Sequence, residues 1–108
     1  MPRQDALQGS LPLLILKILS RRGALHGYAI TAHIEAASGL LRVEEGSLYP
    51  ALHRMEEAGW VSARWQTTEN NRRARVYELT ALGRKELRSE EQRWTSVTAA
   101  IAQVLRRA

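Results

Sequence analysis

The sequence contains no cysteine among its 108 residues, and this absence excludes several kinds of site. A chain without cysteine has no disulfide framework, no thiol nucleophile and no thiolate ligands for a metal. Disulfides are typical of secreted proteins, whereas a chain without them fits a reducing compartment. We therefore expect a cytoplasmic protein.

A long hydrophobic segment is also missing. The apolar stretch that begins at Leu11 ends at Lys17 and is followed by Arg21 and Arg22, whereas a membrane span needs about 18 to 20 apolar residues. Internal repeats and tracts rich in proline, glycine or serine are absent as well, so neither a linker nor a long disordered segment is expected. The apolar stretch is interpreted as core, and no membrane partner is expected.

Catalytic and metal-binding patterns are lacking too. The three histidines, His26, His33 and His53, belong to separate expected elements and have no acidic partner at ligand spacing. No nucleophile stands beside a base, and no glycine-rich loop has the spacing that binds phosphates. We expect no enzyme, no metal site and no cofactor.

The charge that is present favours a polyanionic partner. Lys and Arg number 16 against 11 acids, which gives a net charge of +5 and a pI near 10.4. Net charge alone does not distinguish DNA, RNA and an acidic membrane. The distribution is more informative, because residues 84–93 mix both signs as a solvated helix face does. By contrast, residues 64–75 contain Glu69 as their only acid and four arginines, Arg64, Arg72, Arg73 and Arg75.

Residues 45–58 predict an amphipathic helix that ends at Gly59. At about 100° per residue, one side of this helix is apolar and the other is polar, with Tyr49 on the border. The apolar side consists of Leu48, Ala51, Leu52, Met55 and Ala58, and the polar side of Gly46, Ser47, Pro50, His53, Arg54 and Glu57.

Pro50 is the irregular feature of this helix, because it lacks an N–H and its ring presses on the carbonyl of Gly46. Either the first turns are distorted, with Gly46 leaving room for the change, or the helix starts only at Tyr49. Both interpretations place four side chains on the exposed end from which a recognition helix contacts base edges and phosphates. These residues are Ser47, Tyr49, His53 and Arg54.

Two further helices are expected before this one and a hairpin after it. Residues 7–19 repeat apolar side chains at helical spacing, at Leu7, Leu11, Leu14, Ile18 and Leu19. Pro12 suggests that the regular helix begins near Leu11, with a short turn or a helical arm before Gly9. Residues 27–38 predict the second helix, with Ile30 and Ile34 in the core.

The hairpin consists of two β-favouring segments, residues 60–65 and 75–79, on either side of a polar stretch. A hairpin alone is only marginally stable, so its large side chains should rest partly on the helices. These side chains are Trp60, Trp65, Tyr77 and Leu79. The order helix, helix, helix, hairpin predicts a winged helix-turn-helix, a mainly α fold with a small two-stranded β-wing.

The final element is a proline-free helix over residues 81–106 with Thr80 as its N-cap. Apolar residues recur along it every seven residues and at the intermediate positions, as in a coiled-coil seam. The seam consists of Leu87, Trp94, Val97, Ile101 and Val104. Because the preceding domain is sealed by its own three helices, we expect the seam to meet the same helix of a second subunit. Residues 1–80 would then form the DNA-binding domain and residues 81–108 the dimerisation helix.

Three blocks of the sequence resemble the PadR family of winged-helix transcriptional regulators. They are GSLYPALHRME at residues 46–56, HGYAI at 26–30 and RVYELTALG at 75–83, and they follow the order and spacing of the family over residues 9–83. One departure lies in the wing, where Ala74 interrupts the basic run and Val76 replaces the first aromatic residue.

The resemblance implies a homodimeric DNA-binding regulator of the short subfamily, in which one C-terminal helix replaces a larger domain. A repressor on a roughly palindromic operator is expected, and a dimeric winged-helix interaction module without sequence-specific DNA binding is the alternative. Expected DNA contacts are Ser47, Tyr49, Pro50, His53 and Arg54 in the recognition helix, Arg72, Arg73 and Arg75 in the wing, and Tyr28 at the start of the second helix.

Trp94 has two interpretations. It resembles a tryptophan of the short subfamily that faces its symmetry mate across the dimer centre and sandwiches a flat aromatic compound. The alternative is plain packing in the dimer seam. A small aromatic effector is therefore a candidate partner.

Overall fold

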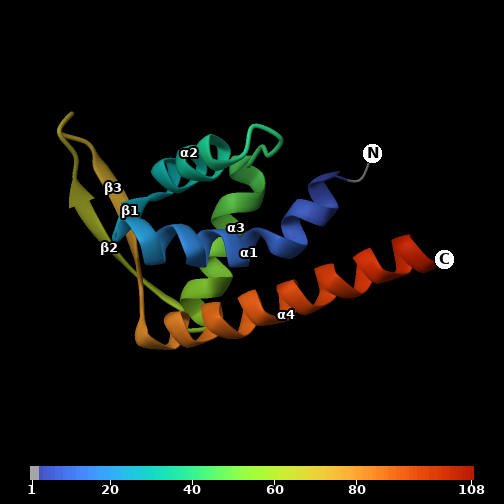
Figure 1. Ribbon diagram of the computed structural model, residues 1–108. Helices are drawn as coiled ribbons and strands as arrows, with labels where there is room; N and C mark the ends of the chain where they lie inside the picture. Colours follow the sequence, from blue (N-terminus) through green and yellow to red (C-terminus); the bar gives the residue numbers. More distant parts are fainter. Residues whose placement is uncertain (1–2) are drawn as a thin grey trace.

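The computed structural model describes the backbone of residues 3–108 and the side chains from residue 9 onward. In this part of the chain, four helices and three strands follow one another (Figure 1). They are α1 (Arg3–Arg22), β1 (Leu25–His26), α2 (Gly27–Ala37), α3 (Glu45–Glu57), β2 (Val61–Thr67), β3 (Arg73–Leu79) and α4 (Ala81–Arg107). The expected winged helix-turn-helix followed by a long helix is confirmed.

The first helix starts earlier than the proline suggested. It begins at Arg3 and contains Pro12, so the expected start near Leu11 is wrong and the alternative of a helical arm is correct. Proline removes one hydrogen bond from a helix at a cost of about 3 kcal/mol. Burial of four apolar side chains on either side of the proline offsets this cost. These are Leu11, Ile15, Leu16 and Leu19, which are almost completely buried.

The residues of α1 that are buried in the core differ in part from the apolar stripe expected from the sequence. Ile15 and Leu16 are buried, although the expected helical stripe did not include them, whereas Leu14 and Ile18 of that stripe are only partly buried. The side chain of Leu7 lies outside the described residues. The difference arises because α1 packs against α2, α3 and α4 together, so a broad surface of this helix is covered.

The sheet contains a strand that the sequence did not reveal. β1 pairs antiparallel with β3, Leu25 opposite Tyr77 and His26 opposite Val76, and the strand order is β1-β3-β2. The wing is therefore the extended end of a three-stranded sheet. A strand of two residues is too short to show a period of two in the sequence.

The helices and the base of the wing share one core. Leu48, Ala51, Leu52 and Met55 of α3 pack with Ile30 and Ile34 of α2 and with Val61, Tyr77 and Leu79 of the sheet. Trp60 packs against this core as expected, but Ala58 is exposed. Trp65 is 55% exposed, so its expected packing on the helices is wrong.

The start of α4 is locked to the end of α3. The Thr80 hydroxyl accepts a hydrogen bond from Gly83 N (3.0 Å) and donates to the Gly59 carbonyl (2.6 Å), which confirms the predicted N-cap. Gly59 itself has a positive φ of 83°, the conformation expected of a glycine just after a helix. A side chain at Gly83 would collide with the Trp60 carbonyl oxygen. Glycine at this position therefore allows the start of α4 to pack directly against the backbone of Trp60.

Leu87 belongs to the protomer and not to the seam. Its side chain is 5% exposed and lies in the core cluster, because α1 packs against α4. Lys17 of α1 also pairs with Glu91 of α4 (2.8 Å). The assignment of Leu87 to the dimer interface is therefore wrong. The apolar residues beyond this point are exposed, namely Trp94, Val97, Ile101, Val104 and Leu105.

Candidate nucleic-acid interface

The exposed face of α3 contains the side chains that the sequence selected. The helix begins at Glu45 and includes Pro50, so a start at Tyr49 is wrong. The carbonyl of Glu44 accepts hydrogen bonds from both Ser47 N (3.0 Å) and Leu48 N (2.9 Å), which satisfies two donors of the first turn. Tyr49, Pro50, His53 and Arg54 are exposed and Ser47 is half-buried.

Tyr28 lies at the surface beside the start of α2. Its ring is 68% exposed and stacks on His26, with a centroid separation of 5.0 Å and an interplanar angle of 13°. The stack holds the Tyr28 ring in place from one side. A hydroxyl at an exposed helix N-terminus can donate to a phosphate, so this residue stays a candidate contact.

The two strands of the wing present two different faces. In the register of β2 and β3, Val61 lies opposite Leu79 and Trp65 opposite Arg75, and side chains of directly opposite residues share a face. We call this the inner face, because Val61 and Leu79 belong to the core beneath the helices. The inner face comprises Val61, Ala63, Trp65, Thr67, Arg73, Arg75, Tyr77 and Leu79.

The four arginines of this region have different environments, although they form one cluster in the sequence. Arg75 lies on the inner face and its Nη2 binds Glu56 Oε2 of α3 at 2.7 Å. Arg64 lies on the opposite face and pairs with Glu78 at 3.1 Å. Arg72 and Arg73 are exposed and form no ion pair with the described side chains.

Arg75 was expected to contact DNA from an exposed wing, but it is half-buried and contacts α3. Its guanidinium joins the wing to α3, because a charge-assisted hydrogen bond holds it to the half-buried carboxylate of Glu56.

The tip of the wing is a tight turn in which Asn71 has a φ of 59°. There Thr68 N donates to the Arg72 carbonyl (2.7 Å) and Arg72 N to Thr68 Oγ1 (3.3 Å). Asparagine tolerates this left-handed conformation better than most residues.

A groove of about 550 Å³ separates α3 from the wing. It is lined by Tyr49, His53, Glu56 and Glu57 of α3 and by Arg75 and Tyr77 of β3. Both carboxylates have basic partners, since Glu56 binds Arg75 and Glu57 lies 3.7 Å from His53 Nδ1. Burial raises the pKa of the Tyr77 phenol, and the nearby Arg75 acts in the opposite direction. The Tyr77 hydroxyl is therefore a neutral donor at physiological pH.

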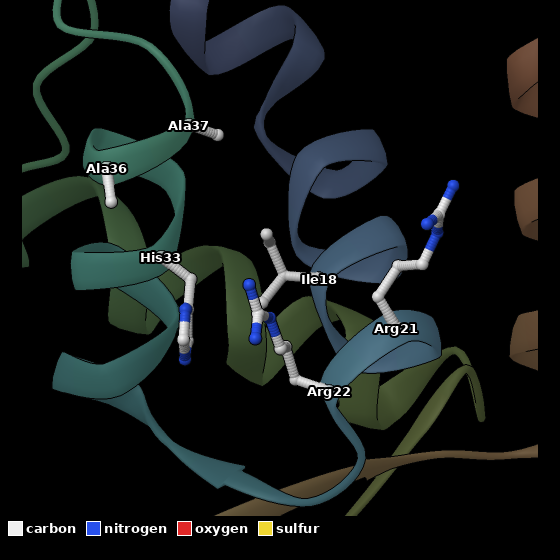
Figure 2. Close-up of a pocket in the computed structure, with 6 residues that line it drawn as sticks. All are labelled: Ile18, Arg21, Arg22, His33, Ala36 and Ala37. Carbon is white, nitrogen blue, oxygen red and sulfur yellow. The ribbon is translucent and has the colours of Figure 1, made fainter.

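A second hollow, of about 470 Å³, lies between α1 and α2 (Figure 2). It shares no lining residue with the groove, and its lining consists of Ile18, Arg21, Arg22, His33, Ala36 and Ala37. The sequence pattern did not indicate it, because its lining residues come from two different helices and the hollow depends on how these helices pack. It adds positive charge to the molecule outside the groove between α3 and the wing.

Among the described side chains, no group of three or more potential ligands is arranged to hold a metal ion. Over the described residues, no helix is both long and apolar enough to cross a membrane.

Residues 15–89 match the transcriptional regulator PadR-like family. The chain belongs to this family. A transcriptional regulator from Clostridium thermocellum is 26% identical, with a TM-score of 0.83 over 92% of this chain and 96% of that one. A PadR family transcriptional regulator from Eggerthella lenta is 25% identical, with a TM-score of 0.82 over 97% and 89% of the two chains. Members of the PadR family are DNA-binding transcription factors and not enzymes.

A more similar sequence belongs to a much longer protein. A 37.1 kDa protein of transposon TN4556 from Streptomyces fradiae is 46% identical over 68 residues. The match spans 63% of this chain but 18% of that protein. The shared segment thus corresponds to a small part of the relative.

Proposed function

We propose that this PadR regulator is a cytoplasmic homodimeric repressor that binds a roughly palindromic DNA duplex. The α3 helix would enter the major groove and the wing would lie along the neighbouring backbone or minor groove. The observation that carries this proposal is the polar face of α3, where Tyr49, His53 and Arg54 are exposed and Tyr49 and His53 line the groove that separates α3 from the wing. Ser47 lies half-buried near the start of the same helix.

The local charges support a phosphate backbone as the partner. One of the two carboxylates that line the groove, that of Glu56, is offset by Arg75, so it opposes an approaching polyanion less than a free acid would. Arg54, Arg72 and Arg73 form no ion pair with the described side chains. Arginines without a carboxylate partner keep their donors for phosphate oxygens or base edges.

The free end of α4 supports a dimer. Trp94, Val97, Ile101 and Val104 are 39–62% exposed and recur at the spacing of a coiled-coil seam. An exposed apolar stripe of this kind is stabilised when a second copy covers it. A twofold axis through two such helices would set two α3 helices on one duplex, which is why the operator should be an inverted repeat. In this proposal, residues 1–80 bind DNA, and the helix within residues 81–108 pairs the subunits through its exposed part from Trp94 onward.

Release from DNA would require an effector that changes the distance between the two recognition helices of the dimer. Such an effector must bind one arrangement of the dimer more tightly than the other, because a ligand with equal affinity for both does not shift the equilibrium between them. Trp94 is the candidate contact for such an effector, a small planar aromatic compound. Its indole is half-exposed in the protomer and would lie near the dimer centre.

Selection of duplexes from a random pool tests the proposal on the full chain. We expect enrichment of an inverted repeat whose half-sites are about one helical turn apart, 10–10.5 base pairs or a multiple of it. An enriched single half-site would contradict the dimeric part of the proposal. Equal, weak and salt-sensitive binding to every duplex would contradict sequence-specific regulation and favour the interaction module.

A further inference from the structure

Trp65 is the exposed aromatic residue of the wing's inner face, and two arginines cover it. The guanidinium carbon of Arg73 lies 5.0 Å from the centre of the indole ring and that of Arg75 lies 5.6 Å from it. Both distances are within the range of a cation–π contact, for which tryptophan is the best aromatic partner. More than half of the Trp65 side chain is exposed to solvent, so core packing does not explain its position.

The strand register produces this arrangement. Trp65 is directly opposite Arg75, and Arg73, two residues before Arg75, is its diagonal neighbour on the same face. Diagonal neighbours in an antiparallel pair are within reach of aromatic and long side chains. The contact therefore follows from the backbone pairing and does not need a particular conformation of the turn.

The two arginines differ in what they can still bind. Glu56 of α3 holds Arg75 through a hydrogen bond of 2.7 Å, so one side of that guanidinium is already occupied. Arg73 is exposed and forms no ion pair with the described side chains. A guanidinium that stacks on an aromatic ring uses its flat face, and its N–H donors remain in the plane for a phosphate.

We propose that Trp65 is a positioning residue that holds Arg73 ready to bind the DNA phosphate backbone. This inference rests on the proposed DNA binding. A free arginine side chain loses rotamer freedom when it binds, and a stack that restricts the side chain beforehand reduces this loss. The contacts from Glu56 through Arg75 to Trp65 also fix the position of the Trp65 ring relative to α3.

Binding of the full chain to its selected duplex tests the proposal through a double-mutant cycle. Trp65→Leu should weaken binding about 3- to 30-fold, whereas Trp65→Phe, which keeps an aromatic face, should retain most of the affinity. In an Arg73→Gln background, Trp65→Leu should have little further effect. The slope of log K against log salt should flatten by about one unit in Arg73→Gln, because one phosphate contact is lost, and by less in Trp65→Leu, which keeps the arginine but no longer restricts it.

Arg64 provides the matched control. It carries the same charge on the same strand as Trp65 but lies on the opposite face and pairs with Glu78. Arg64→Gln and Trp65→Leu should therefore act additively. Equal melting temperatures of parent and Trp65→Leu would exclude a general loss of structure, as expected for a half-exposed residue.

Two results would overturn the inference, and they are distinguishable. A parent protein that selects no duplex removes the proposed function and this inference with it. A parent that selects its duplex, while Trp65→Leu either binds equally well or acts additively with Arg73→Gln, removes the inference alone.

Discussion

The phenol ring of Tyr49 occupies the space that a side chain at Gly27 would need. A Cβ atom on Gly27 would lie 2.6 Å from Tyr49 Oη and 2.8 Å from Cε1, both well inside van der Waals contact. Gly27 is the first residue of α2 and is buried, whereas Tyr49 belongs to the exposed end of α3. The glycine therefore leaves room at the start of α2 for the ring of Tyr49, which is a candidate DNA contact.

Gly27→Ala should change the stability with a sign that depends on Tyr49. In a helix, alanine is favoured over glycine by about 0.5–1 kcal/mol, but the collision with the ring should outweigh this gain and destabilise the parent by about 1 kcal/mol. In a Tyr49→Ala background the collision is absent, so the same substitution should stabilise the protein. Urea unfolding of the four variants measures both values. Equal effects in the two backgrounds would show that the ring does not fill this space.

Tyr77 should make the protein sensitive to alkaline pH. Burial raises the pKa of its phenol above the ordinary value of 10.0, with Arg75 opposing the shift. From about pH 10 upward, the unfolded chain loses a phenolic proton that the folded chain retains, so the contribution of Tyr77 to stability is complete below that pH and is lost as pH rises through the folded pKa. Unfolding free energies from about pH 8 to about pH 11 should fall less steeply in Tyr77→Phe. An unchanged slope in Tyr77→Phe would refute the assignment.

The local pattern of the sequence was sufficient to predict α3 and its two faces. Burial of Leu48, Ala51, Leu52 and Met55 follows from the helical period alone, and the opposite face then has to be exposed. The N-cap at Thr80 and the stop at Gly59 were predictable for the same reason, because each depends on residues within a few positions of itself.

Features that depend on pairing between distant segments were not predictable. Nothing in Leu25 and His26 indicates that they meet β3, and the seven-residue repeat of α4 does not reveal that α1 covers Leu87. The arginines of the wing looked equivalent until the register separated Arg75 and Arg73 from Arg64. Each of these features depends on which segments lie side by side in the fold. The spacing of apolar residues within one segment does not contain this information.

Arg54→Ala should weaken binding to the selected duplex more than binding to bulk DNA. The side chain is exposed on α3 and forms no ion pair with the described side chains, so it can reach a base edge in the major groove. Loss of a base contact costs about 1–3 kcal/mol of discrimination. Competition between the selected duplex and bulk DNA measures this difference. A uniform loss on all duplexes would instead assign Arg54 to a phosphate.

Ile101→Asp should dissociate the dimer without unfolding the protomer. Ile101 is 54% exposed in the protomer and lies outside its core, whereas in a dimer seam an unpaired carboxylate would cost several kcal/mol. Sedimentation at micromolar concentration should show a paired parent and a monomeric variant, and operator affinity should fall together with pairing. Leu82→Asp is the control, since Leu82 is 50% exposed near the start of α4, on another side of the helix. A monomeric parent would contradict the dimer and the inverted-repeat operator together.

Trp94→Ala separates the two interpretations of the exposed indole. If Trp94 contacts a planar aromatic effector, the variant should remain dimeric, because Val97, Ile101 and Val104 still cover the seam, and it should lose the quenching of tryptophan fluorescence that such compounds cause in the parent. The remaining emission comes from Trp60 and Trp65, which lie on the winged domain and serve as the internal reference. If Trp94 only packs, the dimer should weaken, since truncation of a buried aromatic side chain costs about 3–5 kcal/mol, and planar aromatic compounds should leave the parent spectrum unchanged. Sedimentation and fluorescence on the same samples therefore distinguish the two interpretations. A dimeric variant that has lost the quenching supports an effector at the dimer centre, whereas a weakened dimer together with a parent that shows no quenching supports packing alone.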